Sequence, residues 1–201
     1  MIKIAITGNI GTGKSTVAKI LKEFGLKVFE SDEIVNKILE EKEVLDELKI
    51  TFGKKIKGLF ISQTSLNKKE LGNFVFSNKE ELCKLESIIH PKINIQKEIF
   101  LTKNSNESVL FFDIPLLFEK NMAEKFNFVF YTFVDEKLQK KRVLQRANMN
   151  EEKFFNILQN QNKLNKNQQN FISLKINTSL DIEKIKVIIR NFLVDNLNLK
   201  I

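Results

Sequence analysis

Short apolar runs alternate along the chain with longer segments of helical periodicity. Isoleucines at positions 2, 4 and 6 alternate with a lysine and an alanine, which predicts a strand at residues 3–7. Four further apolar runs predict strands at residues 26–30, 109–114, 128–134 and 173–176. Apolar residues at helical spacing predict helices at residues 16–24, 32–39 and 135–147. This alternation predicts an α/β fold with a mostly parallel sheet flanked by helices, and ligands at the carboxyl ends of its strands.

One long interval breaks the alternation. From about residue 66 to residue 101 the pattern is helical only, which predicts a helical insertion beside the sheet. Such an insertion either holds a second substrate or packs as ordinary outer helices, and the pattern does not decide between these. A second helical interval covers residues 135–167, and its part at residues 139–161 is the expected lid. No repeat or proline-rich linker divides the sequence, so residues 1–201 are expected to form a single domain.

A glycine-rich loop follows the first expected strand. Residues 8–16 read Gly-Asn-Ile-Gly-Thr-Gly-Lys-Ser-Thr and satisfy the phosphate-loop pattern G-x-x-x-x-G-K-[ST] without a substitution. Its glycines let backbone N–H groups turn toward a phosphate, and the start of the next helix adds to that attraction. We expect Lys14 to reach the β- and γ-phosphates, the Ser15 hydroxyl to ligate Mg²⁺, and Thr16 to place a hydroxyl near the α-phosphate.

Composition narrows the class of protein only slightly. The single cysteine, Cys83, excludes an intramolecular disulfide, and no cleavable apolar segment is recognised at the N-terminus, so a cytoplasmic location is expected. The net charge of +8 suits nucleic acid, anionic lipid or polyphosphate ligands equally. No nucleic-acid-binding module is recognised, and the most apolar stretch, residues 126–134, is far shorter than the roughly 20 residues of a membrane helix. Neither a nucleic acid nor a membrane is therefore expected as a partner.

The phosphate loop alone does not decide between GTPases, motors and small-molecule kinases. A guanine-reading N-K-x-D sequence is not found in the chain, because each Asn-Lys pair lacks the aspartate. A GTPase is therefore not expected, and the short chain argues against a large mechanical ATPase.

Two aspartates follow predicted strands, at the edge of the sheet where ligands gather. Asp32 could accept a proton from an attacking hydroxyl, for which an ordinary carboxylate suffices because the proton leaves late in a loose transition state. It could equally cap the helix that follows. Asp113 ends a buried run, where a carboxylate is costly without a charged partner. It either contacts Mg²⁺, directly or through water, or caps a loop.

Three further residues have both a structural and a functional interpretation. Arg142 and Arg146 are four residues apart, so they are expected on one face of a helix, either as transition-state stabilisers in a closing lid or as solvated surface residues. His90 is the only histidine, and it could donate to a substrate phosphate or be structural. Pro91 after it suits the first turn of a new helix.

These segments together resemble the dephospho-coenzyme A kinase family. The matching stretches, in family order across nearly the whole chain, are residues 7–16, 30–34, 89–91, 113–119 and 139–146, with Gln161. The sequence Asp-Ile-Pro-Leu-Leu-Phe-Glu at 113–119 and the His90-Pro91 step are the more specific matches. The chain departs from the pattern at Asn167, at Phe171-Ile172, in lacking a glycine after Asn177, and at Glu30, where an aspartate is common.

The resemblance implies transfer of the γ-phosphate of ATP to the ribose 3′-hydroxyl of dephospho-coenzyme A, with Mg²⁺ bound to the nucleotide. It implies that Asp32 is the base and that Lys14 and Arg142 are the main phosphate stabilisers. The implied ATP-binding residues are Gly11, Thr12, Gly13, Lys14, Ser15, Thr16, Arg142, Arg146 and Asn177. The implied acceptor-binding residues are Asp32, His90, Pro115 and Leu116, and the implied metal ligands are Ser15 and Asp113. A monomer is expected.

Two rival functions remain at this point. One is another small-molecule kinase of the same fold, acting on a nucleoside or nucleotide. The other is a nucleotide-dependent regulatory or RNA-binding module that uses the basic surface.

Overall fold

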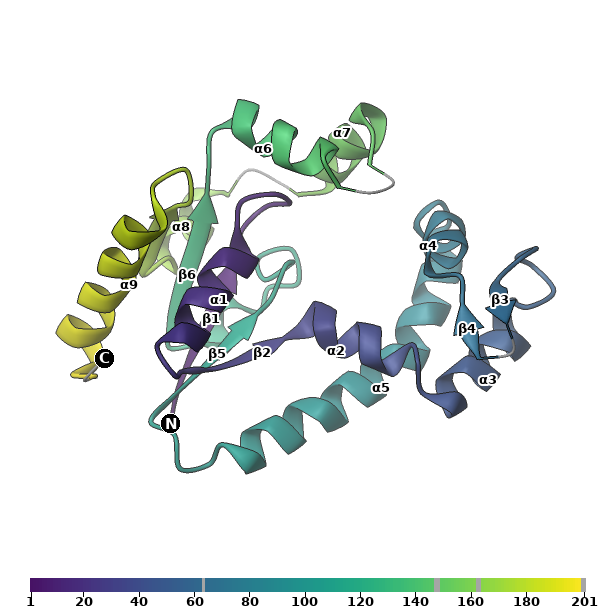
Figure 1. Cartoon of the computed structure of the whole chain (residues 1–201), viewed down its shortest axis with the longest axis horizontal. Coiled ribbons are helices and arrows are strands. Elements are labelled where there is room, and N and C mark those ends of the chain that lie inside the picture. Colours follow the sequence, from purple (N-terminus) through teal and green to yellow (C-terminus); the bar gives the residue numbers. More distant parts are fainter. Residues whose placement is uncertain (63, 147–148, 162–163, 200–201) are drawn as a thin grey trace. The chain divides into compact units, whose positions relative to one another are not determined.

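The computed structural model describes residues 1–62, 64–146, 149–161 and 164–199. The chain divides into two compact units (Figure 1). The first, here called the sheet unit, comprises Met1–Glu30 and Asn104–Ile201, and the second, the helical unit, comprises Ser31–Lys103. The expected insertion, residues 66–101, covers only part of the helical unit.

A five-stranded sheet forms the centre of the sheet unit. Its order is β2 (Lys27–Glu30), β5 (Val109–Asp113), β1 (Ile2–Thr7), β6 (Phe128–Phe133) and β7 (Leu174–Asn177). Every neighbouring pair is parallel. The α/β class and the five expected strands are confirmed. Because all strands run the same way, their carboxyl ends share one edge of the sheet.

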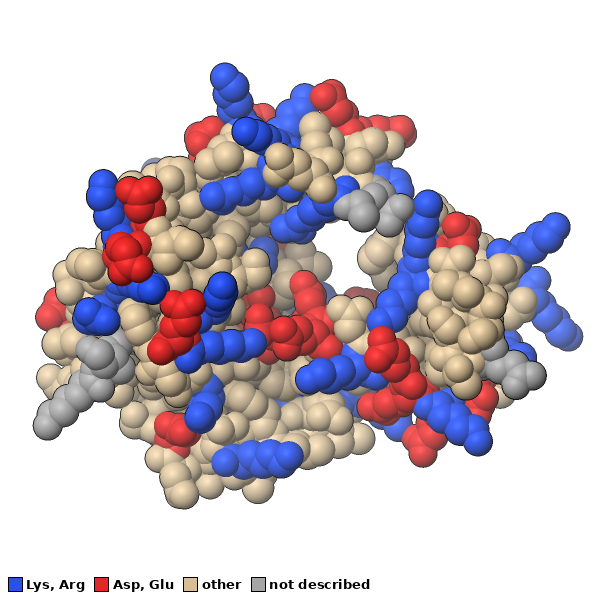
Figure 2. Space-filling view, in the orientation of Figure 1, with Lys and Arg blue, Asp and Glu red and all other residues tan. Residues whose placement is uncertain are grey.

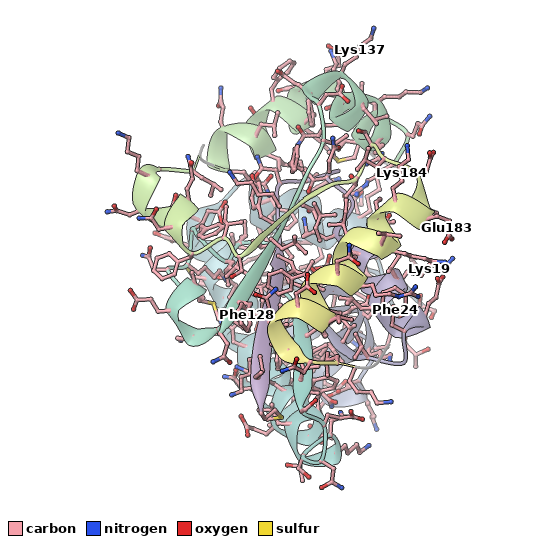
Figure 3. All side chains as sticks on the ribbon, turned by 90° about the vertical axis from the view of Figure 1, so that its left-hand side faces the viewer. Lys19, Phe24, Phe128, Lys137, Glu183 and Lys184 are labelled. Carbon is pink, nitrogen blue, oxygen red and sulfur yellow. The ribbon has the colours of Figure 1, made fainter. Side chains whose placement is uncertain are left out.

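One face of the sheet packs against α1 (Lys14–Glu23) and α9 (Ile182–Leu197). Ile4 and Ile6 of β1 point into this core, whereas Ala5 between them points to the opposite face. Figure 3 looks onto α9, whose Phe192 ring lies 5.5 Å from the Phe128 ring and 5.0 Å from the Phe130 ring, between ring centres. Edge contacts of this kind favour aromatic pairs beyond the area that they bury.

The opposite face is covered by the connection between β5 and β6. Leu117 and Phe118 of this connection are buried against Ala5 and Val129, and the short 3₁₀ helix Ala123–Lys125 adds Ala123. The remaining helices of the sheet unit are α6 (Glu136–Leu144), α7 (Glu151–Asn160) and α8 (Lys166–Asn170). The helix expected at 135–147 is therefore observed as α6, and Ala147 lies outside the described residues.

The helical unit has its own apolar core. It contains α2 (Ser31–Ile38), α3 (Lys42–Phe52), the hairpin β3 (Phe60–Ser62) and β4 (Ser65–Leu66), α4 (Lys68–Phe76) and α5 (Lys79–Lys103). All of its helices and the hairpin contribute to one cluster, in which Leu48, Phe52 and Val75 are essentially inaccessible to solvent. A buried carboxylate, Glu81, receives hydrogen bonds from Lys55 and Lys84, each at 2.8 Å, and these bonds lower its pKa.

The expectation that a new helix begins at Pro91 is wrong, because α5 runs through this residue without a break. A proline inside a helix removes one backbone hydrogen bond and crowds the preceding turn, at a cost of about 3 kcal/mol. Here Ile88 and Ile89 before it are buried, and Ile93 after it packs on the same core. Packing on both sides of Pro91 therefore keeps the helix continuous.

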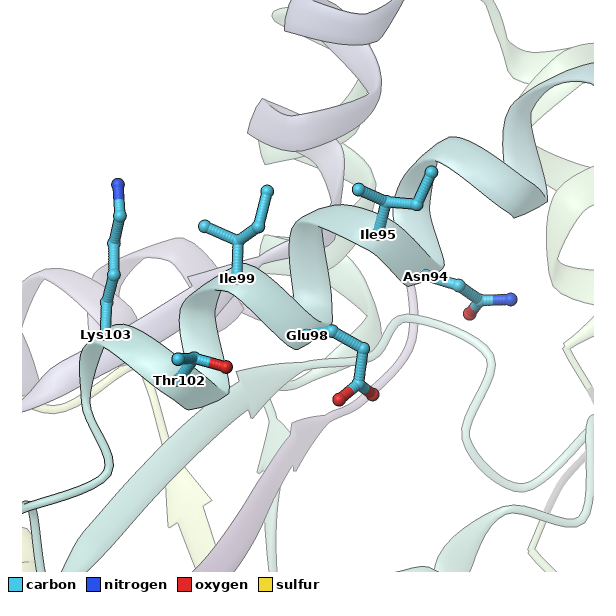
Figure 4. A pocket seen from close by; sticks show the side chains of 6 residues that line it. All are labelled: Asn94, Ile95, Glu98, Ile99, Thr102 and Lys103. Atoms are coloured by element: carbon cyan, nitrogen blue, oxygen red, sulfur yellow. The ribbon is translucent and has the colours of Figure 1, made fainter.

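The surface shows no single field of one charge on the face seen in Figure 2, where basic and acidic side chains are interspersed. A shallow recess follows α5 and is lined by Asn94, Ile95, Glu98, Ile99, Thr102 and Lys103 (Figure 4). It contains none of the expected site residues. Within the described ranges, no helix combines the length and apolar character needed to cross a membrane.

The core between α9 and the sheet can be tested with Ile189, which is fully buried there. We expect Ile189→Ala to lower the free energy of unfolding by about 2–5 kcal/mol, because it removes buried methyl groups and leaves a cavity. Val187 lies two residues away with 51% of its surface exposed, so Val187→Ala is the matched control. It should change the free energy of unfolding by about 0.5 kcal/mol or less. Urea titrations followed by circular dichroism measure both, and equal losses would contradict this assignment of the core.

Candidate active site

The phosphate loop begins where β1 ends, at the carboxyl edge of the sheet. Its glycines Gly8, Gly11 and Gly13 have φ values of +148°, +77° and +90°, which L side chains rarely adopt. Among the described residues no side chain caps the N-terminus of α1, so its first N–H groups face the loop with the positive end of the helix dipole. This arrangement favours an anion such as a phosphate.

Lys14 is the first residue of α1 and its side chain turns back over the loop. Its Nζ donates to the carbonyl of Gly8 at 2.7 Å and to that of Asn9 at 3.2 Å. The ammonium is therefore held by backbone oxygens beside the N–H groups of the loop. Thr12, Ser15 and Thr16 complete the loop, with Thr12 buried and Ser15 exposed.

Buried hydroxyl groups tie the loop to the neighbouring strand. Thr12 Oγ1 donates to the Asn9 carbonyl at 2.7 Å and lies 2.8 Å from Thr132 Oγ1 on β6. Thr132 Oγ1 in turn lies 3.2 Å from the Thr7 carbonyl. Both threonines are almost completely buried, so losing one partner would leave a polar group unsatisfied.

Two glutamines hold the backbone at Ile10, near the tip of the loop. Gln139 on α6 donates through Nε2 to the Ile10 carbonyl at 2.7 Å, and Gln161 after α7 accepts from the Ile10 N–H at 2.8 Å. The backbone of this residue is therefore fixed by side chains from two segments of the expected lid, 139–161. Whether this segment moves as a lid stays a prediction.

Arg142 reaches the loop through Thr178. Its Nη1 donates to Thr178 Oγ1 and its Nη2 to the Thr178 carbonyl, each at 2.9 Å. Thr178 Oγ1 donates to the carbonyl of Thr12 at 2.7 Å. Arg142 is thus placed beside the phosphate loop, and its contact with a phosphate stays a prediction.

Arg146 lies two residues beyond the end of α6, so it does not share a helix face with Arg142 as expected. It is exposed. Asn177 ends β7, and its Oδ1 accepts hydrogen bonds from the N–H and the hydroxyl of Ser179. These contacts shape the turn after β7. A role of Asn177 in binding adenine stays a prediction.

Asp113 is the last residue of β5 and is 8% exposed. It pairs in register with Ile6, so it lies at the same edge of the sheet as the loop. Pro115 and Leu116 follow in the turn after β5, and Leu116 is 38% exposed. The sheet unit therefore brings the loop, Asp113 and this turn to one edge.

Asp32 and His90 belong to the helical unit. Asp32 is exposed in the first turn of α2, two residues after the end of β2. It is the second residue of the helix, so it does not occupy the N-cap position that was its alternative interpretation. His90 lies within α5 with its side chain half exposed, and its Nε2 is 3.8 Å from Glu86 Oε1.

The sequence did not identify Thr132 or Thr178 as parts of the site. Threonine is common in strands and turns, so residue type does not distinguish these two, and Thr178 differs only in replacing the glycine that the family pattern has after Asn177. Gln139 and Gln161 match the family pattern, but nothing around them in the sequence indicates a role. All four act on the loop through contacts between residues more than 100 positions apart.

The chain matches solved structures over nearly its whole length. A crystal structure of TT1252 from Thermus thermophilus is 26% identical with a TM-score of 0.75, and each chain is covered to 97%. A dephospho-CoA kinase from Campylobacter jejuni is 25% identical with a TM-score of 0.65, with each chain covered to 96%. The first strand of the parallel sheet leads through a complete phosphate loop into a helix, and the chain is similar to a kinase. These two observations define a P-loop kinase.

The sequence comparisons define the family. A protein-family model described as dephospho-CoA kinase matches residues 2–179. A dephospho-CoA kinase from Fusobacterium nucleatum is 40% identical over 159 residues, which cover 79% of this chain and 80% of that protein. The chain belongs to the dephospho-CoA kinase family and is an ATP-dependent kinase.

Close packing around Gly11 gives a test of the loop geometry. A Cβ on Gly11 would lie 2.5 Å from Val143 Cγ2, whereas a Cβ on Gly25, with φ +79°, meets nothing within 4 Å. Both glycines have nearly the same φ, so Gly25→Ala carries the backbone strain without the clash. We expect Gly11→Ala to weaken ATP binding by about tenfold or more, equivalent to at least 1.4 kcal/mol, and Gly25→Ala to leave ATP affinity unchanged.

Calorimetric titration with a non-hydrolysable ATP analogue measures both affinities, and thermal unfolding shows the strain that the two variants share. An unchanged affinity in Gly11→Ala would show that the contact between α6 and the loop does not set the geometry of the loop.

Proposed function

We propose that the protein transfers the γ-phosphate of ATP to the ribose 3′-hydroxyl of dephospho-coenzyme A, giving coenzyme A and ADP. The observation that carries this proposal is the match of the family model to residues 2–179, which spans both units and every proposed site residue. The net charge of +8 supports it as well, because ATP and the acceptor are both anionic.

Nucleotide binding is assigned to the phosphate loop and the residues around it. The backbone N–H groups of residues 11–16 would cradle the β- and γ-phosphates, and Lys14 and Arg142 would stabilise the charge on the phosphoryl group in transfer. The contacts of Lys14 with two loop carbonyls and of Arg142 with Thr178 support these roles, since both cations are already ordered at the loop. Thr16, Arg146 and Asn177 would contribute further contacts to the nucleotide.

Mg²⁺ is the proposed metal. Ser15 would supply a hydroxyl and Asp113 a carboxylate, and hard oxygen ligands are what Mg²⁺ prefers. A dedicated cluster of three or more metal-ligating side chains is not found in the described part of the chain. Mg²⁺ bound mainly through one carboxylate, a hydroxyl and nucleotide oxygens requires no such cluster. When bound, the ion neutralises charge on the phosphates.

Asp32 is the proposed base, and His90, Pro115 and Leu116 are the proposed contacts of the acceptor. Asp32 is exposed in the first turn of α2, so its carboxylate is available to accept a proton. Its position two residues beyond the carboxyl end of β2 supports the assignment, because ligands of parallel sheets bind near those strand ends. We further propose that the protein acts as a monomer in the cytoplasm, without a nucleic-acid partner.

A coupled assay of ADP release tests the proposed reaction. The purified chain is supplied with MgATP and either dephospho-coenzyme A or a panel of nucleosides and nucleotides. We expect ADP release to depend on dephospho-coenzyme A, and mass spectrometry should find one added phosphate on its ribose. Stimulation by a nucleoside but not by dephospho-coenzyme A would replace the proposal by the function of a nucleoside kinase.

The role of Asp32 is tested by Asp32→Asn, which keeps the shape of the side chain but removes its capacity to accept a proton. We expect kcat to fall by about 10²–10⁴-fold, the range for loss of general base catalysis, while ATP affinity is retained. Asp46→Asn on α3 removes a carboxylate that is also exposed but lies outside the proposed site, and it should keep kcat. Steady-state kinetics of the unaltered protein and the two variants measure kcat. A near-normal kcat in Asp32→Asn would reject Asp32 as the base.

A further inference from the structure

Every polar group of Thr178 forms a hydrogen bond. Its N–H donates to the Phe133 carbonyl at 3.0 Å, its own carbonyl accepts from Arg142 Nη2, and its hydroxyl makes two further bonds. The residue is 4% exposed. It also adjoins the loop, since a Cβ placed on Gly13 would lie 2.8 Å from Thr178 Oγ1. Thr178 is therefore fixed between β6, the phosphate loop and Arg142.

The direction of its hydroxyl bonds follows from chemistry. A carbonyl cannot donate, so the single hydroxyl proton of Thr178 goes to the Thr12 carbonyl at 2.7 Å. A guanidinium cannot accept, so the lone pairs of the same oxygen receive the Arg142 Nη1–H at 2.9 Å. One oxygen thus links the phosphate loop to the arginine. The linked bonds polarise one another in the same sense, which strengthens both.

Arg142 is held by neutral acceptors. Within the described ranges no carboxylate forms an ion pair with it, and its two hydrogen-bond acceptors are both oxygens of Thr178. A carboxylate would order the side chain equally well, but it would compete with a phosphate for the positive charge. Thr178 orders the guanidinium and leaves its charge uncompensated. The guanidinium has five N–H donors, so the two bonds to Thr178 leave further donors for phosphate oxygens.

We propose that Thr178 is a positioning residue for phosphoryl transfer: its hydroxyl holds the Arg142 guanidinium beside the phosphate loop before ATP binds. The proposal rests on the proposed function, in which Arg142 stabilises the transferring phosphoryl group. A long arginine side chain loses much rotamer freedom when it is ordered. Because Thr178 orders Arg142 in advance, less of this cost falls on the binding of ATP and on the transition state.

Two substitutions separate the hydroxyl from the volume of the side chain. Thr178→Val keeps the branched shape beside Gly13 but removes the hydroxyl, and Thr178→Ser keeps the hydroxyl and removes a methyl group. We expect Thr178→Val to lower kcat and the affinity for an ATP analogue by about tenfold or more each, as for a lost hydrogen bond to a charged group. Thr178→Ser should restore most of both, and the KM for dephospho-coenzyme A should not change in either variant.

A double-mutant cycle with Arg142→Ala tests whether Thr178 acts through the arginine. Once Arg142 is gone, Thr178→Val should cause a clearly smaller further loss, because only the bond of the hydroxyl to the Thr12 carbonyl remains to be broken. Thr132→Val is the matched control. It removes another buried hydroxyl beside Thr12 that does not contact Arg142, so its effect should be the same with and without the arginine.

The cycle is measured on affinity for the ATP analogue as well as on turnover, and thermal unfolding confirms that each variant is folded. An equal loss in Thr178→Ser and Thr178→Val would overturn the proposal, as would a loss in Thr178→Val that is equally large in the Arg142→Ala background. The affinity measurement needs no acceptor. If the chain does not phosphorylate dephospho-coenzyme A, the proposed function fails while the cycle still decides the role of Thr178.

Discussion

The burial of β1 between β5 and β6 is the constraint on which the site depends. Both neighbours run parallel to β1, and the register places Ile6 beside Asp113 and Thr7 beside Tyr131. The carboxyl ends of the three strands therefore meet at one edge, where the chain leaves β1 and enters the phosphate loop. Ile4 and Ile6 fix this register, because a slip by one residue would move both from the core to the opposite face. The place of the loop is thus decided by apolar packing several residues away from it.

The conformation of the loop depends on its surroundings as much as on its glycines. Glycine permits positive φ but does not enforce it, since an unfolded loop gains more entropy from glycine than from any other residue. The contacts with Thr132, Thr178, Gln139 and Gln161 select one conformation, and all of them come from beyond β5 in the chain. Each net hydrogen bond contributes only about 0.5–1.5 kcal/mol, but a buried partner left without its bond costs more. The loop is therefore held in one conformation, because its neighbours would lose hydrogen bonds if it moved.

The difference between local signals and contacts of distant residues explains what the sequence could predict. The five strands of the sheet, the loop and α1, α2 and α6 follow from signals within a few residues, namely alternation, helical spacing and a motif, and all of these elements form. The strand order and the residues that hold the loop depend on contacts across more than 100 positions, which one sequence does not reveal. The hairpin of β3 and β4 was not predicted either, because strands of three and two residues are too short to show an alternating pattern. Arg146 was placed on a helix that ends two residues earlier, which is the usual uncertainty of helix ends.

The helical unit shows the limit of local signals most clearly at Pro91. A break there would save about 3 kcal/mol of helix strain. It would also redirect the chain between Ile89 and Ile93, which pack on the same core from either side of the proline. Burial of one isoleucine side chain contributes about 1.5–3 kcal/mol, and Ile88 and Ile89 are both 93% buried, as their 7% exposure shows. The stabilisation lost by a break would thus match or exceed the strain relieved. A proline marks the weakest point of α5, and the packing on its two sides decides that the helix continues.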